Sequence, residues 1–278
     1  MTRYTQEIEP LAREAGALLM SYFSRRIGFE YKGDVDLVTE ADRASEKLIT
    51  SKLRARWPEF GVLGEEGTKS DLGAEYRWLV DPLDGTTNFA HGYPVFCVAI
   101  ALVRADDQIE AGFLFDPTRD EFFSAERGQG ARLNGQTMRV SKTRELAESL
   151  LGTGFPSHKR HKNPNVHFYH QLTLRSHGLR RAGSAALDLA NVAAGRYDGF
   201  WEFNLNPWDT AAGVLLVREA GGVVTRFDGS PFRLSSEEVL ASNGIIHDEL
   251  MRNFEEMFAG RDLEEVPSPV EYAKARTL

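Results

Sequence analysis

The chain has 278 residues, of which 42% are hydrophobic, and 33 Lys and Arg against 41 Asp and Glu give a net charge of −8. A chain of this length and composition can bury a full core, which excludes a disordered protein and a small disulfide scaffold. The acidic balance disfavours a general nucleic-acid binder, because phosphate contacts need basic faces.

The cysteine content and the chain start favour a cytoplasmic protein. Cys97 is the single cysteine and has no internal partner for a disulfide, which fits a reducing compartment. The longest apolar run, residues 95–103, is half of what a membrane crossing needs, and no basic start with an apolar core marks a signal peptide. We expect a cytoplasmic enzyme with no membrane partner and no nucleic-acid partner.

The first part of the chain predicts two helices followed by strands. Apolar residues recur at helical spacing in the first segment, at Ile8, Leu11, Ala15, Leu18, Leu19, Tyr22 and Phe23. Residues 39–57 predict a second helix, capped by Thr39 and ended by Pro58. Short apolar runs at 76–80, 95–103, 109–115 and 121–124 predict strands, and the glycines and Asn134 of 128–135 predict a tight loop.

The later part alternates between the two element types. Strands are expected at 149–153, 197–203 and 223–227, and helices at 184–194, 207–220 and 246–258. Pro207 suits the start of a helix and Gly221-Gly222 its end. This alternation indicates layered helices and sheets of the α/β class. A subdomain boundary is expected near 140–150, and a polar tail begins at Arg261.

Three acidic clusters are the candidate site. They are Glu65-Glu66 after an apolar run, Asp81 and Asp84 after the 76–80 strand, and Asp209 at a helix start. Gathering carboxylates is costly unless a cation neutralises them, and oxygen ligands without His or Cys suit Mg²⁺ better than Zn²⁺. The glycine after Asp84 precedes a possible helix N-terminus, which attracts anions. The alternative for Asp84 and Thr86 is a simple turn and cap.

Taken together, these motifs resemble the inositol monophosphatase family, within the lithium-sensitive, magnesium-dependent phosphatase superfamily. The matching pieces run in the family's order over roughly residues 5 to 258: Asp36-Leu-Val-Thr-Glu-Ala-Asp42, Gly64-Glu65-Glu66, Trp78-Leu-Val-Asp-Pro-Leu-Asp-Gly-Thr-Thr-Asn-Phe89, Gly183-Ser-Ala185, Trp208-Asp209 and Glu219-Ala-Gly-Gly222. The resemblance implies a layered α-β-α-β-α sandwich of the inositol monophosphatase / fructose-bisphosphatase type, usually assembled as a homodimer.

The resemblance also implies two to three Mg²⁺ ions per site. Glu65, Asp81 and the backbone carbonyl of Leu83 would hold the first, which lowers the pKa of the attacking water. Asp81, Asp84 and Asp209 would hold the second, which stabilises the leaving alkoxide. A third, weaker ion would lie near Glu65.

The implied catalytic residues are Asp42, Thr86 and Glu65. Thr86 and Asp42 would orient the water and accept its proton, and the N–H groups of Gly85 and Thr86 would bind phosphate. Asp42 has an alternative role, because Thr39-x-x-Asp42 also matches a helix-capping arrangement. The two roles are compatible.

The resemblance also implies the substrate-binding residues, which are Gly183, Ser184, Ala185 and Glu202. Glu202 matches the family acid that binds substrate hydroxyls. The alternative for Glu202 is an ordinary acid at a strand end. Thr87-Asn88-Phe89 favours the inositol monophosphatase branch. Lys32 matches a family lysine close to the metal site, and is equally explained as a solvated loop charge.

The segment from Gly154 to Leu187 has no acidic residue. It contains six basic residues and five histidines: Lys159, Arg160, Lys162, Arg175, Arg180, Arg181, His158, His161, His167, His170 and His177. A solvated basic face explains this pattern best, and the alternative is an electropositive rim that attracts phosphorylated substrates.

The leading hypothesis is a Mg²⁺-dependent phosphomonoesterase that hydrolyses inositol monophosphates or similar polyol phosphates. The alternatives are a related phosphatase for histidinol phosphate, fructose 1,6-bisphosphate or 3′-phosphonucleotides, and a regulatory RNA- or protein-binding member of the fold. We expect an N-terminal α+β subdomain (1–145) with most metal ligands, a C-terminal α/β subdomain (146–260) with the substrate loop and Asp209, and the tail (261–278).

Overall fold

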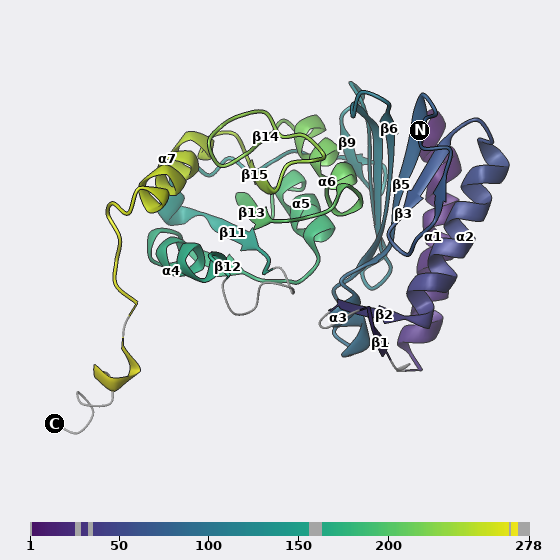
Figure 1. Cartoon of the computed structure of the whole chain (residues 1–278). Helices are drawn as coiled ribbons and strands as arrows, with labels where there is room; N and C mark the ends of the chain where they lie inside the picture. The colour runs from purple at the N-terminus through teal and green to yellow at the C-terminus, as the bar shows by residue number, and fades with distance from the viewer. Residues whose placement is uncertain (1, 26–28, 33–35, 156–162, 267, 272–278) are drawn as a thin grey trace.

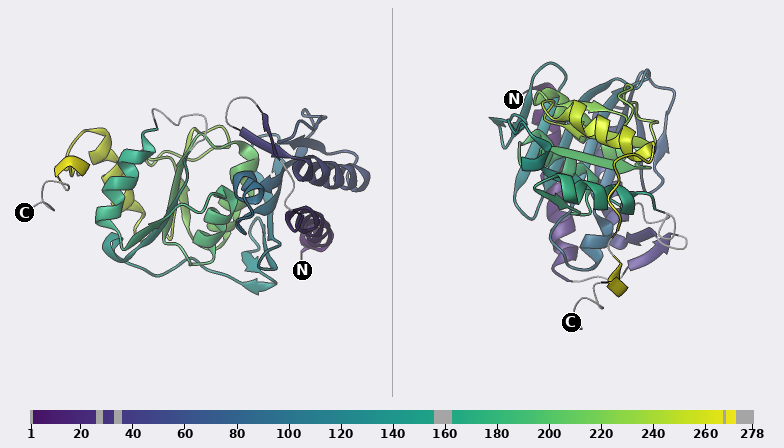
Figure 2. Two further views of the ribbon diagram at one scale, coloured as in Figure 1. Left: turned by 90° about the horizontal axis from the view of Figure 1, so that it is seen from below. Right: turned by 90° about the vertical axis from the view of Figure 1, so that its left-hand side faces the viewer.

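The protein is a stack of five layers (Figure 1). The computed structural model describes residues 2–25, 29–32, 36–155, 163–266 and 268–271. Helices α1 (Arg3–Phe23) and α2 (Glu40–Arg56) cover one face of a large sheet, and α5 (Ala185–Ala193) and α6 (Pro207–Glu219) cover the other. A small sheet follows, and α4 (Asn165–Arg175) and α7 (His247–Phe258) pack on its outer face. Figure 2 shows the same order from below. The predicted α-β-α-β-α sandwich is confirmed.

The two sheets differ in how their strands are connected. Within the described residues, the strands of the large sheet are, in spatial order, β10 (Gln136–Thr137), β9 (Ala131–Leu133), β8 (Glu121–Glu126), β7 (Ile109–Asp116), β6 (Cys97–Arg104), β5 (Tyr76–Asp84), β3 (Gly61–Gly64) and β4 (Lys69–Ser70). Those of the small sheet are β12 (Gly178–Arg180), β11 (Leu150–Thr153), β13 (Gly199–Phe203), β15 (Glu238–Ser242) and β14 (Val223–Thr225). The large sheet is antiparallel except for β3 beside β5. In the small sheet, β11 lies parallel to both of its neighbours.

Three shorter elements flank the large sheet. Strands β1 (Phe29–Lys32) and β2 (Asp36–Thr39) form an antiparallel pair, and α3 (Thr86–Ala90) follows β5. A turn of 3₁₀ helix, Leu146–Glu148, precedes β11.

Helix α6 is apolar on almost every side because it lies between the two sheets. Its residues from Thr210 to Val217 are all buried. Gly112 of β7 lets it approach closely, since a Cβ there would meet the carbonyl oxygen of Ala212 at 2.7 Å. Gly213 does the same toward α5, where a Cβ would lie 2.5 Å from Cβ of Leu189. Glycines at these two crossings bring α6 tightly against β7 and against α5.

Most of the expected elements form, with differences of a few residues at their ends. The predicted loop at 128–135 instead contains β9, which a two-residue turn at Asn134 and Gly135 joins to β10. Both turn residues have positive φ, 48° and 79°, as a tight hairpin requires. Sequence reasoning did not predict β1 to β4, β12, β15 or α4. In α4 the apolar Val166 and Leu174 are exposed, so its apolar residues do not mark one buried face.

The start of the tail is attached to α4. The buried side chain of Gln171 donates through Nε2 to the carbonyl of Glu264 and accepts from its N–H, at 2.7 and 3.1 Å. Beyond this point the described tail extends away from the layers (Figure 1). No helix in the described ranges is long and apolar enough to cross a membrane.

Candidate active site

The end of β5 carries the central pair of carboxylates. Its pairing with β6 shifts between Asp81, opposite Ala99, and Asp84, opposite Cys97, so that Pro82 and Leu83 form a bulge. The N–H of Leu83 donates to Oδ1 of Asp81 at 3.0 Å, which stabilises the bulge. This irregularity is how one strand end contributes two nearby acids.

A left-handed glycine follows the bulge and starts α3. Gly85 has φ of 94°, and a Cβ there would lie 2.8 Å from the carbonyl oxygen of Val95. A larger residue would therefore be both strained and in collision. This turn brings the N–H groups of Gly85 and Thr86 next to the acidic end of β5.

Asp42 performs the capping role and also contacts the site. Its Oδ2 accepts hydrogen bonds from the N–H and the hydroxyl of Thr39, at 2.8 and 2.5 Å, as a capping residue of α2. Its Oδ1 accepts from the hydroxyl of Thr86 at 3.1 Å. That hydroxyl also lies 3.0 Å from the carbonyl oxygen of Leu83. One buried carboxylate thus links the start of α2 to the predicted water-orienting threonine.

A buried acid that sequence reasoning missed holds the Glu65 loop. Glu46 of α2 accepts hydrogen bonds from the N–H of Glu66 (2.6 Å), the N–H of Thr68 (2.9 Å) and the hydroxyl of Thr68 (2.6 Å). Gly64 makes room for it, because a Cβ there would lie 2.3 Å from Oε2 of Glu46. The spacing Asp42 to Glu46, one helical turn, was the available signal.

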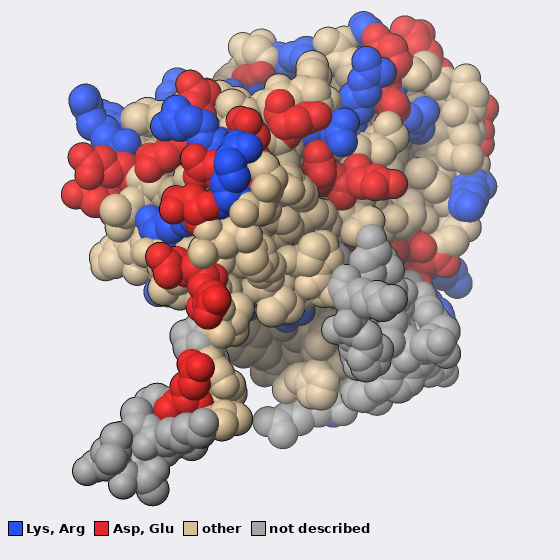
Figure 3. All heavy atoms as spheres, turned by 60° about the vertical axis from the view of Figure 1, so that its left-hand side comes forward, with Lys and Arg blue, Asp and Glu red and all other residues tan. Residues whose placement is uncertain are grey.

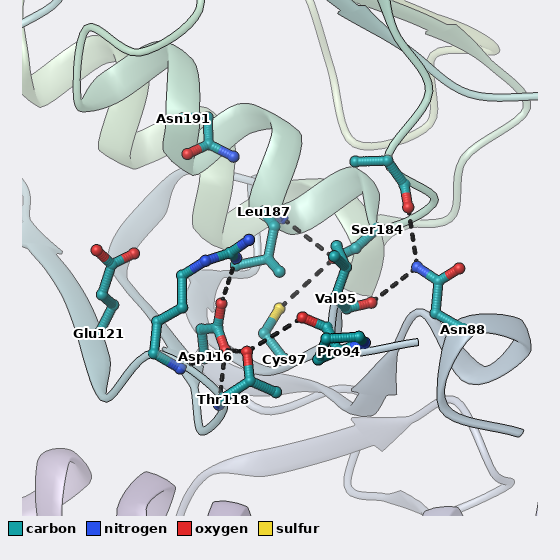
Figure 4. A network of polar contacts seen from close by, with 12 residues as sticks. Asn88, Pro94, Val95, Cys97, Asp116, Thr118, Glu121, Ser184, Leu187 and Asn191 are labelled. Carbon is teal, nitrogen blue, oxygen red and sulfur yellow. Dashed lines mark hydrogen bonds and ion pairs between the residues drawn. The ribbon is translucent and has the colours of Figure 1, made fainter. Parts of the chain in front are cut away.

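The Gly183-Ser-Ala185 loop is bonded to the β5 end from the opposite side. The hydroxyl of Ser184 and the N–H of Ala186 both donate to Oδ2 of Asp84, at 2.6 and 2.8 Å. Nδ2 of Asn88 donates to the carbonyls of Ala182 and Val95, at 2.9 and 2.8 Å. Figure 4 shows Asn88 reaching both segments and the side chains of Cys97 and Ser184 facing each other.

Asp209 lies at the N-terminus of α6, and its carboxylate belongs to the same acidic cluster as Asp81 and Asp84. Its Oδ2 accepts from the N–H of Asn206 at 2.6 Å, within a capping arrangement like that of Asp42. Pro207 occupies the first helical turn, as the sequence predicts. One helix cap and one strand end therefore position three of the predicted ligands, Asp209, Asp81 and Asp84.

These acids strongly influence one another's ionisation. Burial raises the pKa of Asp81 well above its usual range, and the charges of Glu65, Asp84 and Asp209 raise it further. Burial, followed by the charge of Asp84, also raises the pKa of Asp209. Burial raises the pKa of Asp84, although the bonds from Ser184 and from Ala186 partly oppose this.

The donor set fits a hard divalent cation. The side chains all offer carboxylate oxygens, which Mg²⁺ prefers, and a cation relieves the mutual repulsion. Within the described ranges, no group of three or more His, Cys, Asp or Glu side chains is already arranged so that it could hold a metal ion. The electrostatic coupling of four acids is the observation that supports the fit.

Glu202 lies at the edge of this cluster, on β13. It is only 8% exposed, and Gly154 of the neighbouring segment makes room for it, since a Cβ there would lie 2.1 Å from Oε1. Burial, and then the charges of Asp84 and Asp209, raise the pKa of Glu202 to about 8, while Arg181 acts in the opposite direction. The alternative of an ordinary surface acid is therefore wrong.

Other sequence candidates lie apart from the cluster. Glu219 accepts from the N–H groups of Gly128 and Gly130, both at 2.8 Å, and so holds the loop before β9. Arg175 bonds to Asn253 and to the carbonyl of Asp262, on the outer layer. Residues 158–162 of the basic segment lie outside the described residues, as does the side chain of Lys32.

Comparison with known proteins identifies the family. The model of the inositol monophosphatase family matches residues 1–258. The chain is 47% identical over 240 residues to "Nus factor SuhB" of Pseudomonas aeruginosa, covering 84% of this chain and 88% of that one. It is 46% identical over 240 residues to an inositol-1-monophosphatase of Synechocystis, covering 85% and 83%. A solved Thermotoga maritima IMPase aligns with a TM-score of 0.85 at 36% identity, covering 94% of this chain and 99% of that one. With its acidic site and this similarity, the chain belongs to the inositol monophosphatase family and is a phosphatase.

Proposed function

We propose that this phosphatase hydrolyses the phosphomonoester of inositol monophosphates or of similar polyol phosphates, with Mg²⁺ as its cofactor. The observation that carries the proposal is the set of four mutually coupled carboxylates, Glu65, Asp81, Asp84 and Asp209, with the Gly85 turn beside it. The name of the Synechocystis relative supports the substrate class.

The residues divide into metal ligands and groups that act on water and phosphate. Glu65, Asp81, the carbonyl of Leu83, Asp84 and Asp209 would hold two to three Mg²⁺ ions. When bound, Mg²⁺ supplies an acidified water and charge stabilisation for phosphoryl transfer. The N–H groups of Gly85 and Thr86 bind the phosphate oxygens, and the loop of Gly183, Ser184 and Ala185 borders the leaving group.

Asp42 and Thr86 direct the attacking water, together with Glu65. The Thr86 hydroxyl accepts from the water and donates to Oδ1 of Asp42, which is already within bonding distance. Asp42 thereby receives the proton through Thr86 while its other oxygen stays bonded to Thr39. Glu202 accepts hydrogen bonds from substrate hydroxyls.

A panel of phosphate esters tests the substrate class. Inositol 1-phosphate, histidinol phosphate, fructose 1,6-bisphosphate and a 3′-phosphonucleotide are assayed with Mg²⁺, with Asp81→Asn as the control for contaminating phosphatases. We expect the highest kcat/KM with inositol 1-phosphate and inhibition by Li⁺ but not by Na⁺. A higher kcat/KM with any of the other three esters would identify that ester, and not inositol 1-phosphate, as the preferred substrate.

A regulatory role is the second candidate, because the Pseudomonas relative is named a Nus factor. On the face shown in Figure 3, basic and acidic side chains are interspersed, which gives no uniform basic patch for RNA there. Binding to RNA or to a protein, with no hydrolysis of any ester in the panel, would favour this role.

We also infer, from the family resemblance, a homodimer and a division into subdomains 1–145 and 146–260 with a tail. The distribution of strands supports the division, since the large sheet ends at Thr137 and the small sheet begins at Leu150. Light scattering of the purified protein tests the dimer.

A further inference from the structure

One buried carboxylate near the site has no role in the mechanism above. Asp188 in the first turn of α5 is 1% exposed, and neither of its oxygens has a hydrogen-bond partner within the described part of the chain. Buried polar atoms of native proteins are nearly always bonded, so an exception calls for an explanation such as a ligand. By contrast, the buried Asp198 accepts hydrogen bonds from Ser141 and from the N–H of Leu150.

Asp188 lies one helical turn after a residue of the site. Its N–H donates to the carbonyl of Ser184, the N-cap of α5, whose side-chain hydroxyl donates to Asp84. The charges that act most strongly on Asp188 are those of Glu202 and Asp84, and they raise its pKa further after burial has raised it. The Asp188 carboxylate therefore lies close enough to the β5 end and to Glu202 for their charges to act on it.

Glu202 is the second buried carboxylate in this region. It is only 8% exposed, and the same neighbouring charge, that of Asp84, raises its pKa. Arg181 acts on both carboxylates with its positive charge. A neutral donor suits this pair better than a second cation, because Arg181 would repel the cation.

We propose that Asp188 and Glu202 together form a two-carboxylate subsite that accepts hydrogen bonds from hydroxyl groups of the leaving alcohol. The new element is Asp188, an additional specificity-determining residue, and the proposal rests on the proposed function. A polyol offers several adjacent donors to such a pair, whereas a simple aryl ester offers none. The substrate class is thus a phosphate ester whose alcohol carries hydroxyls beside the phosphorylated carbon.

The test compares Asp188→Leu and Asp188→Asn on inositol 1-phosphate and on an aryl phosphate at saturating Mg²⁺. We expect the ratio of kcat/KM for inositol 1-phosphate to kcat/KM for aryl phosphate to fall at least tenfold with Leu. The fall is smaller with Asn, which keeps one acceptor. Glu202→Gln lowers the same ratio, and the double variant loses less than the product of the single losses because both residues hold the same substrate.

The melting temperature distinguishes this role from a structural one. Asp188→Leu removes an unbonded buried carboxylate that the charges of Glu202 and Asp84 repel, so the melting temperature without substrate should stay equal or rise. Asp198→Asn, the matched control, should lower it, since that carboxylate is fully bonded. A lower melting temperature for Asp188→Leu, or an unchanged substrate ratio, would overturn the subsite. A wild-type enzyme inactive on inositol 1-phosphate would instead overturn the proposed function.

Discussion

Single side chains in this protein combine structural and chemical tasks. Asp42 caps α2 with one oxygen and contacts Thr86 with the other, so neither sequence interpretation has to be discarded. Asp209 likewise caps α6 with Oδ2 while its charge acts within the acidic cluster. Capping fixes each carboxylate against the backbone, and a fixed carboxylate loses little entropy when it binds a ligand.

Asp81 is the residue whose loss should matter most. Asp81→Asn keeps the shape but removes the charge that faces three other acids, so we expect turnover to fall more than tenfold at saturating Mg²⁺. The melting temperature of the metal-free protein should rise, because one of four repelling charges is gone. A variant with more than a tenth of wild-type turnover would contradict the central placement of Asp81.

At the scale of elements, the site depends on the places where regular structure is interrupted. The bulge at the end of β5 and the loop after β3 each present carboxylates at a strand end. The segment before α5 closes the site from the other side. Each interruption is held by a specific side chain, namely Glu46 for the Glu65 loop and Asn88 for the loop at Ala182.

The role of Glu46 leads to a testable change in metal affinity. Glu46→Ala removes three hydrogen bonds to residues 66–68, so the Glu65 loop loses its fixed position. We expect Mg²⁺ affinity, measured by calorimetry, to fall about ten- to a hundredfold, as for other residues that orient metal ligands. Ser51→Ala, on the exposed side of the same helix, is the control and should leave the affinity unchanged. Equal Mg²⁺ affinity for Glu46→Ala and wild type would show that the Glu65 loop keeps its position without the hydrogen bonds of Glu46.

His247 makes the junction of α7 with the small sheet sensitive to pH. Its ring nitrogens lie 2.9 Å from the hydroxyl of Thr225 and 2.8 Å from that of Ser242. Burial lowers the pKa of His247, and Asp248 opposes this only in part. The unfolded chain therefore binds the proton more readily, so this contribution to stability is complete above about pH 6.5 and is lost as pH falls.

Melting curves between pH 7.5 and pH 5.5 test this. The decrease in melting temperature should be smaller for His247→Gln than for wild type, whereas the exposed His177→Gln should follow wild type. The same decrease in all three proteins would contradict a role for His247.

For the whole molecule, the acidic site draws on both halves of the chain. Glu65, Asp81 and Asp84 come from the large sheet and its loops, whereas Asp209 and Glu202 belong to α6 and the small sheet. A cation bound among them should therefore stabilise the entire stack of layers.

Metal addition and removal test this coupling. Millimolar Mg²⁺ should raise the melting temperature of wild type, since binding to the folded state alone adds RT ln(1 + [Mg²⁺]/Kd) to the free energy of unfolding. A chelator should reverse the rise, Na⁺ at equal ionic strength should not reproduce it, and Asp81→Asn should show less of it. An unchanged melting temperature of wild type would argue against a bound divalent cation.

Much of the fold was predictable because the spacing of apolar residues along the sequence shows which face of a helix or strand is buried. Strands β5 to β8 of the large sheet and helices α1, α2, α6 and α7 have enough apolar residues to reveal their period. Helix α4 has as many apolar residues, but Val166 and Leu174 are exposed, so they do not mark a single buried face. It forms because the small sheet and its outer helices bury its remaining apolar residues together. The prediction of a loop around β9 was wrong. Its glycine content suggests irregular structure, but a two-residue Asn-Gly turn forms a hairpin there.

The acidic residues of the site were evident in the sequence, because carboxylates repeat in short motifs after apolar runs. Their partners were determined only by the tertiary structure. Glu46 and Asp188 each lie one turn beyond a motif and belong to none. Glu46 is important because it bonds the Glu65 loop, and Asp188 because the charge of Glu202 acts on it. Residue type alone determines what a side chain can bind, but burial and the distance to other charges, which folding creates, decide which acids act together.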